Sequence, residues 1–268
     1  MKTITGIHGV PRSGTSWLAQ IFNSSPAVSL KFQPLFSYAF KDFLNLESTS
    51  EDIDIFFEKI YKSEDYFINM NDKEIHKNYP KFAKQNDLEH LVFKHVRYHY
   101  LIPKILQNNS NAKFILVVRN PLAVLSSWKN APREFNPEWD FDLEWTYANK
   151  KNQFRSSEYF GYKKWKEATG LFFDLEKEYS NRVTVVWYDQ LLSNTMEEVE
   201  RLFRFAGIPM LNSVADFVTK SKSKTVSGHN SVYRKKNTAD DGWKQHISTD
   251  IREAIQEDLK GHFLENLM

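Results

Sequence analysis

The chain has 268 residues, with 36 basic and 34 acidic side chains and no cysteine. The near balance of charge excludes a whole-surface attraction to nucleic acid or to membranes, so any anion binding must be local. The missing cysteines exclude disulfides, a thiolate nucleophile and cysteine-ligated metals. The length suits one α/β domain, residues 1–268, with a substantial core.

No signal for a membrane or for secretion is found in the chain. No apolar run approaches the roughly 18 residues that a membrane-spanning helix needs, and a strand that starts at Thr3 leaves no room for a signal peptide. We therefore expect a soluble cytoplasmic protein with no membrane span and no nucleic-acid partner.

The first 24 residues hold the most informative pattern. Ile4 and Ile7 with β-branched neighbours predict a short buried strand, the turn residues within 9–14 end it, and apolar residues within 17–22 recur at helical spacing. A helix that begins after a tight loop directs unpaired backbone N–H groups and the positive end of its dipole at one point. This geometry predicts an anion site.

The loop resembles a P-loop in which the positively charged residue lies at a different position. Gly9-x-x-x-x-Gly14 has the spacing of GxxxxGK[ST], but Thr15 stands where the lysine would be, and Arg12 supplies a cation inside the loop. Since the P-loop lysine serves a metal-bridged triphosphate, its loss argues against ordinary ATP chemistry. The alternative is a plain strand-to-helix turn whose glycines serve only the backbone.

The rest of the chain alternates between strand and helix patterns, which predicts a parallel sheet with helices on both faces. Residues 30–90 are expected to form a helical insertion or lid on the acceptor side, or merely an insertion. The predicted elements are strands at 28–32, 91–93, 114–118 and 183–187, helices at 36–44, 53–61, 101–106, 122–128, 195–206 and 251–263, aromatic-rich helical sequence at 138–179, and a basic, structure-poor segment at 219–246.

A second anion motif follows the most apolar strand, residues 114–118. Arg119-Asn-Pro121 lies directly after it, and Ser127 comes eight residues after the arginine. Arginine suits the planar, multidentate binding of phosphate oxygens. Taken alone, Arg119 and Ser127 could equally cap a helix and form a surface ion pair.

Together the two motifs resemble the phosphate-binding signatures of the sulfotransferases that use 3′-phosphoadenosine 5′-phosphosulfate (PAPS). Pro11-Arg-Ser-Gly-Thr-Ser-Trp17 resembles that family's 5′-phosphosulfate loop, and Arg119 with Ser127 resembles its 3′-phosphate motif. The strand and turn at 183–192 resemble a third family segment. The resemblance implies a three-layer sandwich of the P-loop NTPase-like sulfotransferase fold, with PAPS as sulfuryl donor, PAP as product and no metal.

Position by position, the resemblance implies which residues bind the donor. The 5′-phosphosulfate side would be bound by Arg12, Ser13, Gly14, Thr15, Ser16 and Trp17, the 3′-phosphate by Arg119 and Ser127, and the base by Tyr188. Arg12 would also stabilise the departing phosphate as a catalytic group. Arg234 and Lys235 are weaker candidates for the 3′-phosphate, because the family's Arg-Lys-Gly run is only partly matched, and a solvated basic loop explains them equally well.

The proton acceptor is the least determined residue. Some family members use an early glutamate, often followed by a proline, as the proton acceptor. The matching pair in this chain is Gln33-Pro34, and glutamine cannot accept a proton. Lys94 matches the lysine of the family's Lys-Thr-His pattern, with His95 one place early. Because only histidine titrates near neutrality in its unperturbed state, His95 is the first candidate and His99 the second. A structural histidine is the alternative for either.

The sequence thus predicts a sulfotransferase acting on a hydroxyl group, with a carbohydrate or glycoconjugate as the favoured acceptor. Two alternatives stay open: a P-loop kinase with an atypical loop, and a non-catalytic module that binds PAP or another nucleotide. The oligomeric state and the role of residues 219–246 cannot be read from the sequence.

Overall fold

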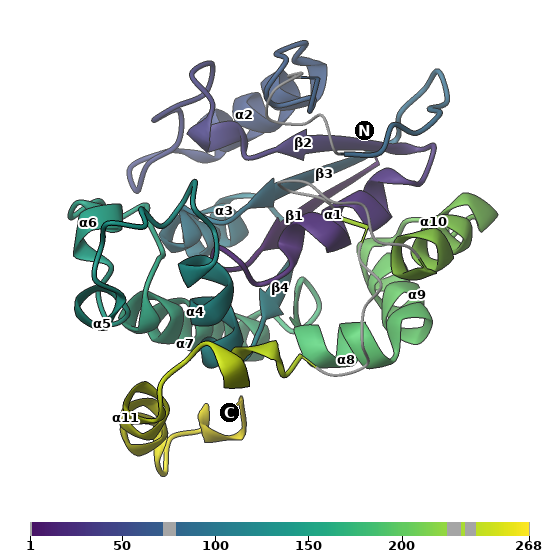
Figure 1. Cartoon of the computed structure of the whole chain (residues 1–268). Helices are drawn as coiled ribbons and strands as arrows, with labels where there is room; N and C mark the ends of the chain where they lie inside the picture. Colours follow the sequence, from purple (N-terminus) through teal and green to yellow (C-terminus); the bar gives the residue numbers. More distant parts are fainter. Residues whose placement is uncertain (1, 72–78, 224–231, 234–239, 268) are drawn as a thin grey trace.

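A computed structural model describes residues 2–71, 79–223, 232–233 and 240–267 (Figure 1). The sheet has five parallel strands in the order β2-β3-β1-β4-β5. In the central strand, Ile4 pairs with Leu91 on one side and with Ala112 on the other. The strands are β1 (Thr3–His8), β2 (Val28–Phe32), β3 (His90–His95), β4 (Ala112–Val118) and β5 (Val183–Trp187).

Helices cover both faces of the sheet, so the molecule has three layers. Side chains of β4 alternate between two cores: Phe114, Leu116 and Val118 face one, and Ile115 and Val117 face the other. The first core is completed by α2, α3, α4, α7 and α11, and the second by α1, α8, α9 and α10. Figure 1 shows α9 and α10 on one side of the sheet and α4, α7 and α11 on the other. The predicted three-layer α/β fold is confirmed.

The helices have these bounds: α1 (Thr15–Asn23), α2 (Ser50–Lys62), α3 (Ile102–Asn108), α4 (Pro121–Lys129), α5 (Phe141–Glu144), α6 (Asn149–Asn152), α7 (Tyr162–Glu178), α8 (Tyr188–Ser193), α9 (Thr195–Ala206), α10 (Asn212–Ser223) and α11 (Thr249–Leu259). Short 3₁₀ turns are η1 (Pro34–Phe36), η2 (His99–Leu101), η3 (Gly242–Gln245) and η4 (Glu265–Leu267).

All carboxyl ends of the strands meet at one edge, because the strands are parallel. The connections that leave this edge carry the loop 9–14 after β1, Gln33 after β2, Arg119 after β4 and Tyr188 after β5. Ligands of open α/β sheets bind at this edge. The topology alone therefore gathers most of the predicted site residues.

Two helices predicted from the sequence differ in the structure. The helix predicted at 36–44 is replaced by η1 and turns: Gln33 enters it with a left-handed φ of 43°, and the Ser37 hydroxyl donates back to the Pro34 carbonyl oxygen at 2.6 Å. The aromatic segment 138–179 is divided into α5, α6 and α7, because Ala148, Gln153 and Phe154 adopt positive φ values that end a helix.

Candidate functional site

The loop between β1 and α1 forms a cradle of backbone. Arg12 and Gly14 both have left-handed φ values, 75° and 97°. A Cβ added to Gly14 would lie 2.4 Å from the Tyr188 ring, so only glycine fits at this position. Gly14 is the N-cap of α1 and provides no side-chain cap, so the N-terminal amides of α1 are left for another acceptor. The arrangement suits an anion.

A hydroxyl group in the cradle has no partner in the described part of the chain. Ser13 Oγ is buried and makes no hydrogen bond there. A buried hydroxyl without a partner is costly, and a phosphate oxygen would satisfy it. Ser13, Gly14 and the first turn of α1 therefore fit a phosphate group.

The two predicted anion motifs are directly joined. Arg12 Nε donates to Ser127 Oγ at 3.0 Å, and Arg119 Nη1 donates to the Arg12 carbonyl oxygen at 2.7 Å. Residues from the junctions β1–α1 and β4–α4 therefore form one site. The two guanidinium groups share the same edge of the sheet, as one nucleotide with phosphates at both ends requires.

Arg119 lies mostly buried between an acid and an aromatic ring. Its Nε and Nη2 each donate to a carboxylate oxygen of Asp240 at 2.6 Å, and its guanidinium lies 4.7 Å from the centre of the Tyr188 ring. The cap of α4 is instead Asn120, whose Oδ1 accepts from Leu122 N at 2.9 Å. Arg119 is therefore neither a helix cap nor part of a surface ion pair, since its side chain is only 15% exposed.

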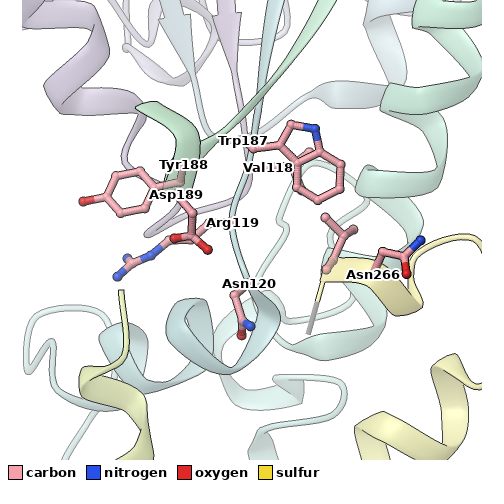
Figure 2. Close-up of a pocket in the computed structure, with 8 residues that line it drawn as sticks. Val118, Arg119, Asn120, Trp187, Tyr188, Asp189 and Asn266 are labelled. Carbon is pink, nitrogen blue, oxygen red and sulfur yellow. The ribbon is translucent and has the colours of Figure 1, made fainter. Parts of the chain in front are cut away.

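Tyr188 lies between the two loops and contacts residues of both. Its ring packs edge-to-face with Trp17, at 6.4 Å between ring centres, and contacts Gly14 as described above. Figure 2 shows Tyr188, Asp189 and the Arg119 side chain together beside the ends of β4 and β5. A cavity of about 60 Å³ lies here, lined also by Asn120, Trp187 and Asn266. This volume is far below the roughly 300–1,000 Å³ of ligand pockets, so it is too small for a nucleoside.

Lys94 faces the site from β3. Its Nζ lies 4.9 Å from the centre of the Phe32 ring and has no hydrogen bond or ion pair with any residue that the structure describes. Burial, with smaller effects from the positive charges of Arg97 and Arg12, lowers the pKa of Lys94 to about 7, and Glu134 opposes the shift. Lys94 is thus a cation that a bound anion would stabilise.

The structure does not bring His95 into the site. As neighbours in a strand, Lys94 and His95 point to opposite faces of the sheet. The His95 ring is buried against His8 and Phe93, and neither ring nitrogen has a partner among the described residues. His99 is equally buried, and its Nδ1 shares a hydrogen bond of 3.1 Å with His8 Nδ1.

Burial keeps this histidine cluster neutral. It lowers the pKa of His8 to about 3, with a smaller contribution from Lys94, and it holds the pKa values of His95 and His99 well below the usual range. The described geometry therefore favours structural roles for His95 and His99 over proton transfer to or from an acceptor hydroxyl.

Several polar residues that the sequence analysis missed lie beside the predicted ones. Tyr79 hydrogen-bonds the Ser16 hydroxyl, and burial raises its pKa. Glu134 Oε2 lies 3.8 Å from Arg12 Nη1. Arg97 donates to Gln33 Oε1 at 3.1 Å and to Glu158 Oε1 at 2.9 Å. None of them belongs to a motif with regular spacing, so their roles depend on the tertiary path of their loops.

Two predicted residues and one segment cannot be placed. Arg234 and Lys235 lie outside the described residues, as does most of 224–239. Over the described ranges, no group of three or more His, Asp or Glu side chains could hold a metal ion. No helix in those ranges is both long and apolar enough to cross a membrane.

The sequence profile described as "Sulfotransferase domain" matches residues 4–267, nearly the whole chain. The protein belongs to the sulfotransferase family. The identification made from the phosphate motifs, as a member of the PAPS-dependent sulfotransferases, is confirmed.

Solved sulfotransferase structures have the same fold. Mouse sulfotransferase SULT7A1, crystallised with PAP, superimposes with a TM-score of 0.58 at 15% identity, over 99% of this sulfotransferase and 87% of the mouse chain. The sulfotransferase domain of the curacin biosynthetic pathway gives a TM-score of 0.51 at 15% identity, over 97% and 98% of the two chains. No curated protein sequence matches the chain.

Proposed function

We propose that this sulfotransferase transfers the sulfuryl group of PAPS to the hydroxyl group of a small acceptor, a carbohydrate or glycoconjugate, and releases PAP. The observation that carries the proposal is the direct connection of the two arginine loops, through Arg12 to Ser127 and through Arg119 to the Arg12 carbonyl oxygen. Two joined cationic loops fit a ligand with phosphate at two positions. The mouse structure with PAP supports the same donor class.

The residues around the loops divide between the two ends of the donor. Arg12, Ser13, Gly14, Thr15, Ser16 and Trp17 would bind the 5′ side, because the α1 amides and the partnerless Ser13 hydroxyl converge there. Arg119 and Ser127 would bind the 3′-phosphate, and Tyr188 would lie against the base. Arg234 and Lys235 stay predictions for the 3′-phosphate side.

When bound, the donor supplies an activated sulfuryl group. The protein's own contribution is charge: Arg12 and Lys94 would stabilise the negative charge that develops on the departing phosphate and on the sulfuryl oxygens. Lys94, whose pKa is about 7 in the unliganded protein, would become fully protonated beside a polyanion. The chemistry of these residues requires no metal.

Exposed aromatic rings occur in two segments that we assign to the acceptor side. Phe36 and Tyr38 leave β2 and are exposed, and Phe154 is exposed in the loop after α6. The Arg97 guanidinium lies 4.1 Å from the centre of the Phe36 ring, which fixes this ring. Flat apolar rings with polar neighbours suit sugar rings, and this supports a carbohydrate acceptor.

The segment 30–90 would serve as the acceptor-side lid. Its described part contains η1 and α2, and Phe32 N donates to the Ile68 carbonyl oxygen at 2.8 Å, so residues near 68 lie against the end of β2. The cytoplasmic location and the absence of a nucleic-acid partner stay predictions.

Two experiments test the proposal. Calorimetry with PAP, without metal, should show binding that the Arg119→Met variant loses. Transfer of labelled sulfate from PAPS to a panel of sugars, glycoconjugates and phenols, resolved by mass spectrometry, should yield a sulfated sugar. Binding of Mg²⁺-ATP without binding of PAP would indicate the kinase alternative, and PAP binding with no turnover on any acceptor would indicate a non-catalytic module.

A further inference from the structure

Glu134 is held rigidly beside the phosphate loop. It lies in the turn that follows α4, where Glu134 N donates to the Ala131 carbonyl oxygen at 2.8 Å. Its own carbonyl oxygen accepts from Trp128 Nε1 at 3.3 Å, and Trp128 is fully buried. The backbone that carries this acid is therefore anchored to the core.

The Glu134 carboxylate has an unused acceptor atom that faces the site. Oε2 is buried, has no hydrogen-bond partner within the described ranges, and lies 3.8 Å from Arg12 Nη1, beyond hydrogen-bond distance. The side chain as a whole is 29% exposed. The group therefore has one enclosed oxygen next to the catalytic arginine and an edge that reaches solvent.

The Glu134 carboxylate lies near charged and titratable groups from several segments of the chain. Burial lowers the pKa values of Lys94 and Lys151 and raises that of Tyr79, and the negative charge of Glu134 contributes an upward shift to all three. Together with Arg12 in the phosphate loop, these groups come from β3, which carries Lys94, from α6, which carries Lys151, and from the segment that carries Tyr79. The carboxylate thus lies among the groups that would surround the transferred sulfuryl group.

Three other residues considered for this role, Gln33, His95 and Lys94, are unsuited to it. Gln33 cannot take a proton, and its Oε1 is held by Arg97. Both nitrogens of His95 are enclosed on the opposite face of β3. Lys94 would be protonated once the polyanionic donor is bound, and a protonated amine cannot act as a base.

We propose that Glu134 is the proton acceptor for the hydroxyl group that is sulfated, an inference that rests on the proposed function. The Glu134 carboxylate takes the hydroxyl proton while the hydroxyl oxygen bonds to sulfur and the sulfur–oxygen bond to the 5′-phosphate breaks, leaving its electron pair on the phosphate. Glu134 then releases the proton to solvent through its exposed edge. No oxidant, reductant or further reactant is needed.

The first test measures protons rather than turnover. Negative charge beside a carboxylate favours its protonated form, so we expect PAP binding to be accompanied by proton uptake. Calorimetric titration with PAP near pH 5.5, in two buffers of different ionisation enthalpy, should show proton uptake that falls in Glu134→Gln. Glu138→Gln, an exposed acid in the same loop, is the matched control and should take up protons like the wild type. Equal uptake by Glu134→Gln and the wild type would overturn the proposal.

The second test measures turnover of PAPS, with water and with a panel of hydroxyl acceptors. Glu134→Gln should lower kcat by about 10²-fold or more, the range of general-base effects, while PAP binds at least as tightly. The acidic limb of the pH–rate profile should disappear in Glu134→Gln and persist in Glu134→Asp. A Glu134→Gln enzyme with the wild-type rate would exclude the role.

Failure of this inference differs from failure of the proposed function. If the wild type neither binds PAP nor consumes PAPS, both are wrong. If the wild type binds PAP and transfers sulfate, and Glu134→Gln does so equally well, only the assignment of Glu134 is wrong. Far-ultraviolet circular dichroism of each variant confirms that the fold is intact.

Discussion

Arg119 and Asp240 form a bidentate ion pair, in which two guanidinium N–H groups donate to the two carboxylate oxygens at 2.6 Å each. The two side chains are only 15% and 12% exposed, so the pair is weakly screened. A carboxylate presents two acceptor oxygens much as a phosphate does. Asp240 therefore occupies the face of Arg119 that we assign to the 3′-phosphate.

This relationship predicts that Asp240 competes with the donor. Asp240→Asn removes the negative charge but keeps the size of the side chain, so we expect PAP to bind about tenfold more tightly, since the competing ion pair no longer has to be broken. Calorimetry with PAP measures the change. Asp241→Asn, an exposed neighbour, is the control. Weaker binding by Asp240→Asn would show instead that Asp240 orients Arg119 for the ligand.

Arg12 should contribute mainly to the rate. Arg12→Lys keeps a positive charge but loses the planar guanidinium group, whose nitrogens lie near both Ser127 and Glu134. We expect kcat for PAPS turnover to fall by about 10²-fold, in the range seen when a group that stabilises transition-state charge is removed. Affinity for PAP should change much less. A large loss of affinity at unchanged kcat would indicate that Arg12 only binds the donor.

Gly14 should tolerate no side chain. Gly14→Ala places a Cβ 2.4 Å from the Tyr188 ring in a backbone with φ 97°. We expect a loss of about 1–3 kcal/mol in the free energy of unfolding, measured by urea denaturation, together with weaker PAP binding. Gly170→Ala is the control, because a Cβ there meets nothing within 4 Å. Equal stability of the two variants would contradict the packing described for Tyr188.

The buried histidines should make the protein sensitive to mild acid. In the unfolded chain His8 takes up a proton near pH 6.5, but in the folded protein burial lowers its pKa to about 3, and His95 and His99 shift in the same direction. Between these values the unfolded state binds more protons, so stability falls as the pH falls below about 6.5. Each histidine contributes at most about 1.4 kcal/mol per pH unit.

Urea denaturation between pH 7.5 and 5.5 measures this slope. His95→Phe should make the free energy of unfolding less dependent on pH, by about the contribution of one histidine. The reason is that the replacement removes a titrating ring from an apolar environment. The exposed-loop variant Glu138→Gln should leave the slope unchanged. A wild-type stability that does not change over this range would show that the histidines titrate normally in the folded protein.

Much of the fold and the two arginine loops could be predicted because both depend on local sequence. A strand, a loop and a helix follow one another at Gly9–Gly14 and again at Arg119–Pro121, and a parallel sheet brings every such junction to one edge. The contacts of Glu134, Asp240 and Tyr79 could not be predicted, since each lies on a loop whose path depends on tertiary packing.

Strand geometry also separates two residues that the sequence interpretation placed in one site. Lys94 and His95 are adjacent in β3, so they cannot both face the phosphate loop. The sequence interpretation assigned chemistry to both, and the structure brings only Lys94 to the loop. The helix predicted at 36–44 was wrong, although the apolar residues there have helical spacing. Gln33 enters η1 with a positive φ, and the Ser37 hydroxyl closes the turn. Hydrophobic periodicity reveals neither feature.

The hydrogen bond from Arg119 to the Arg12 carbonyl oxygen has a wider consequence. Arg12 has a left-handed backbone, a conformation that surrounding contacts must stabilise, and this hydrogen bond holds its carbonyl group. The shape of the loop that carries Arg12 therefore depends on the side chain of Arg119. We expect the two proposed phosphate sites to be coupled through this hydrogen bond, so that a change at Arg119 alters binding at the loop that holds Arg12.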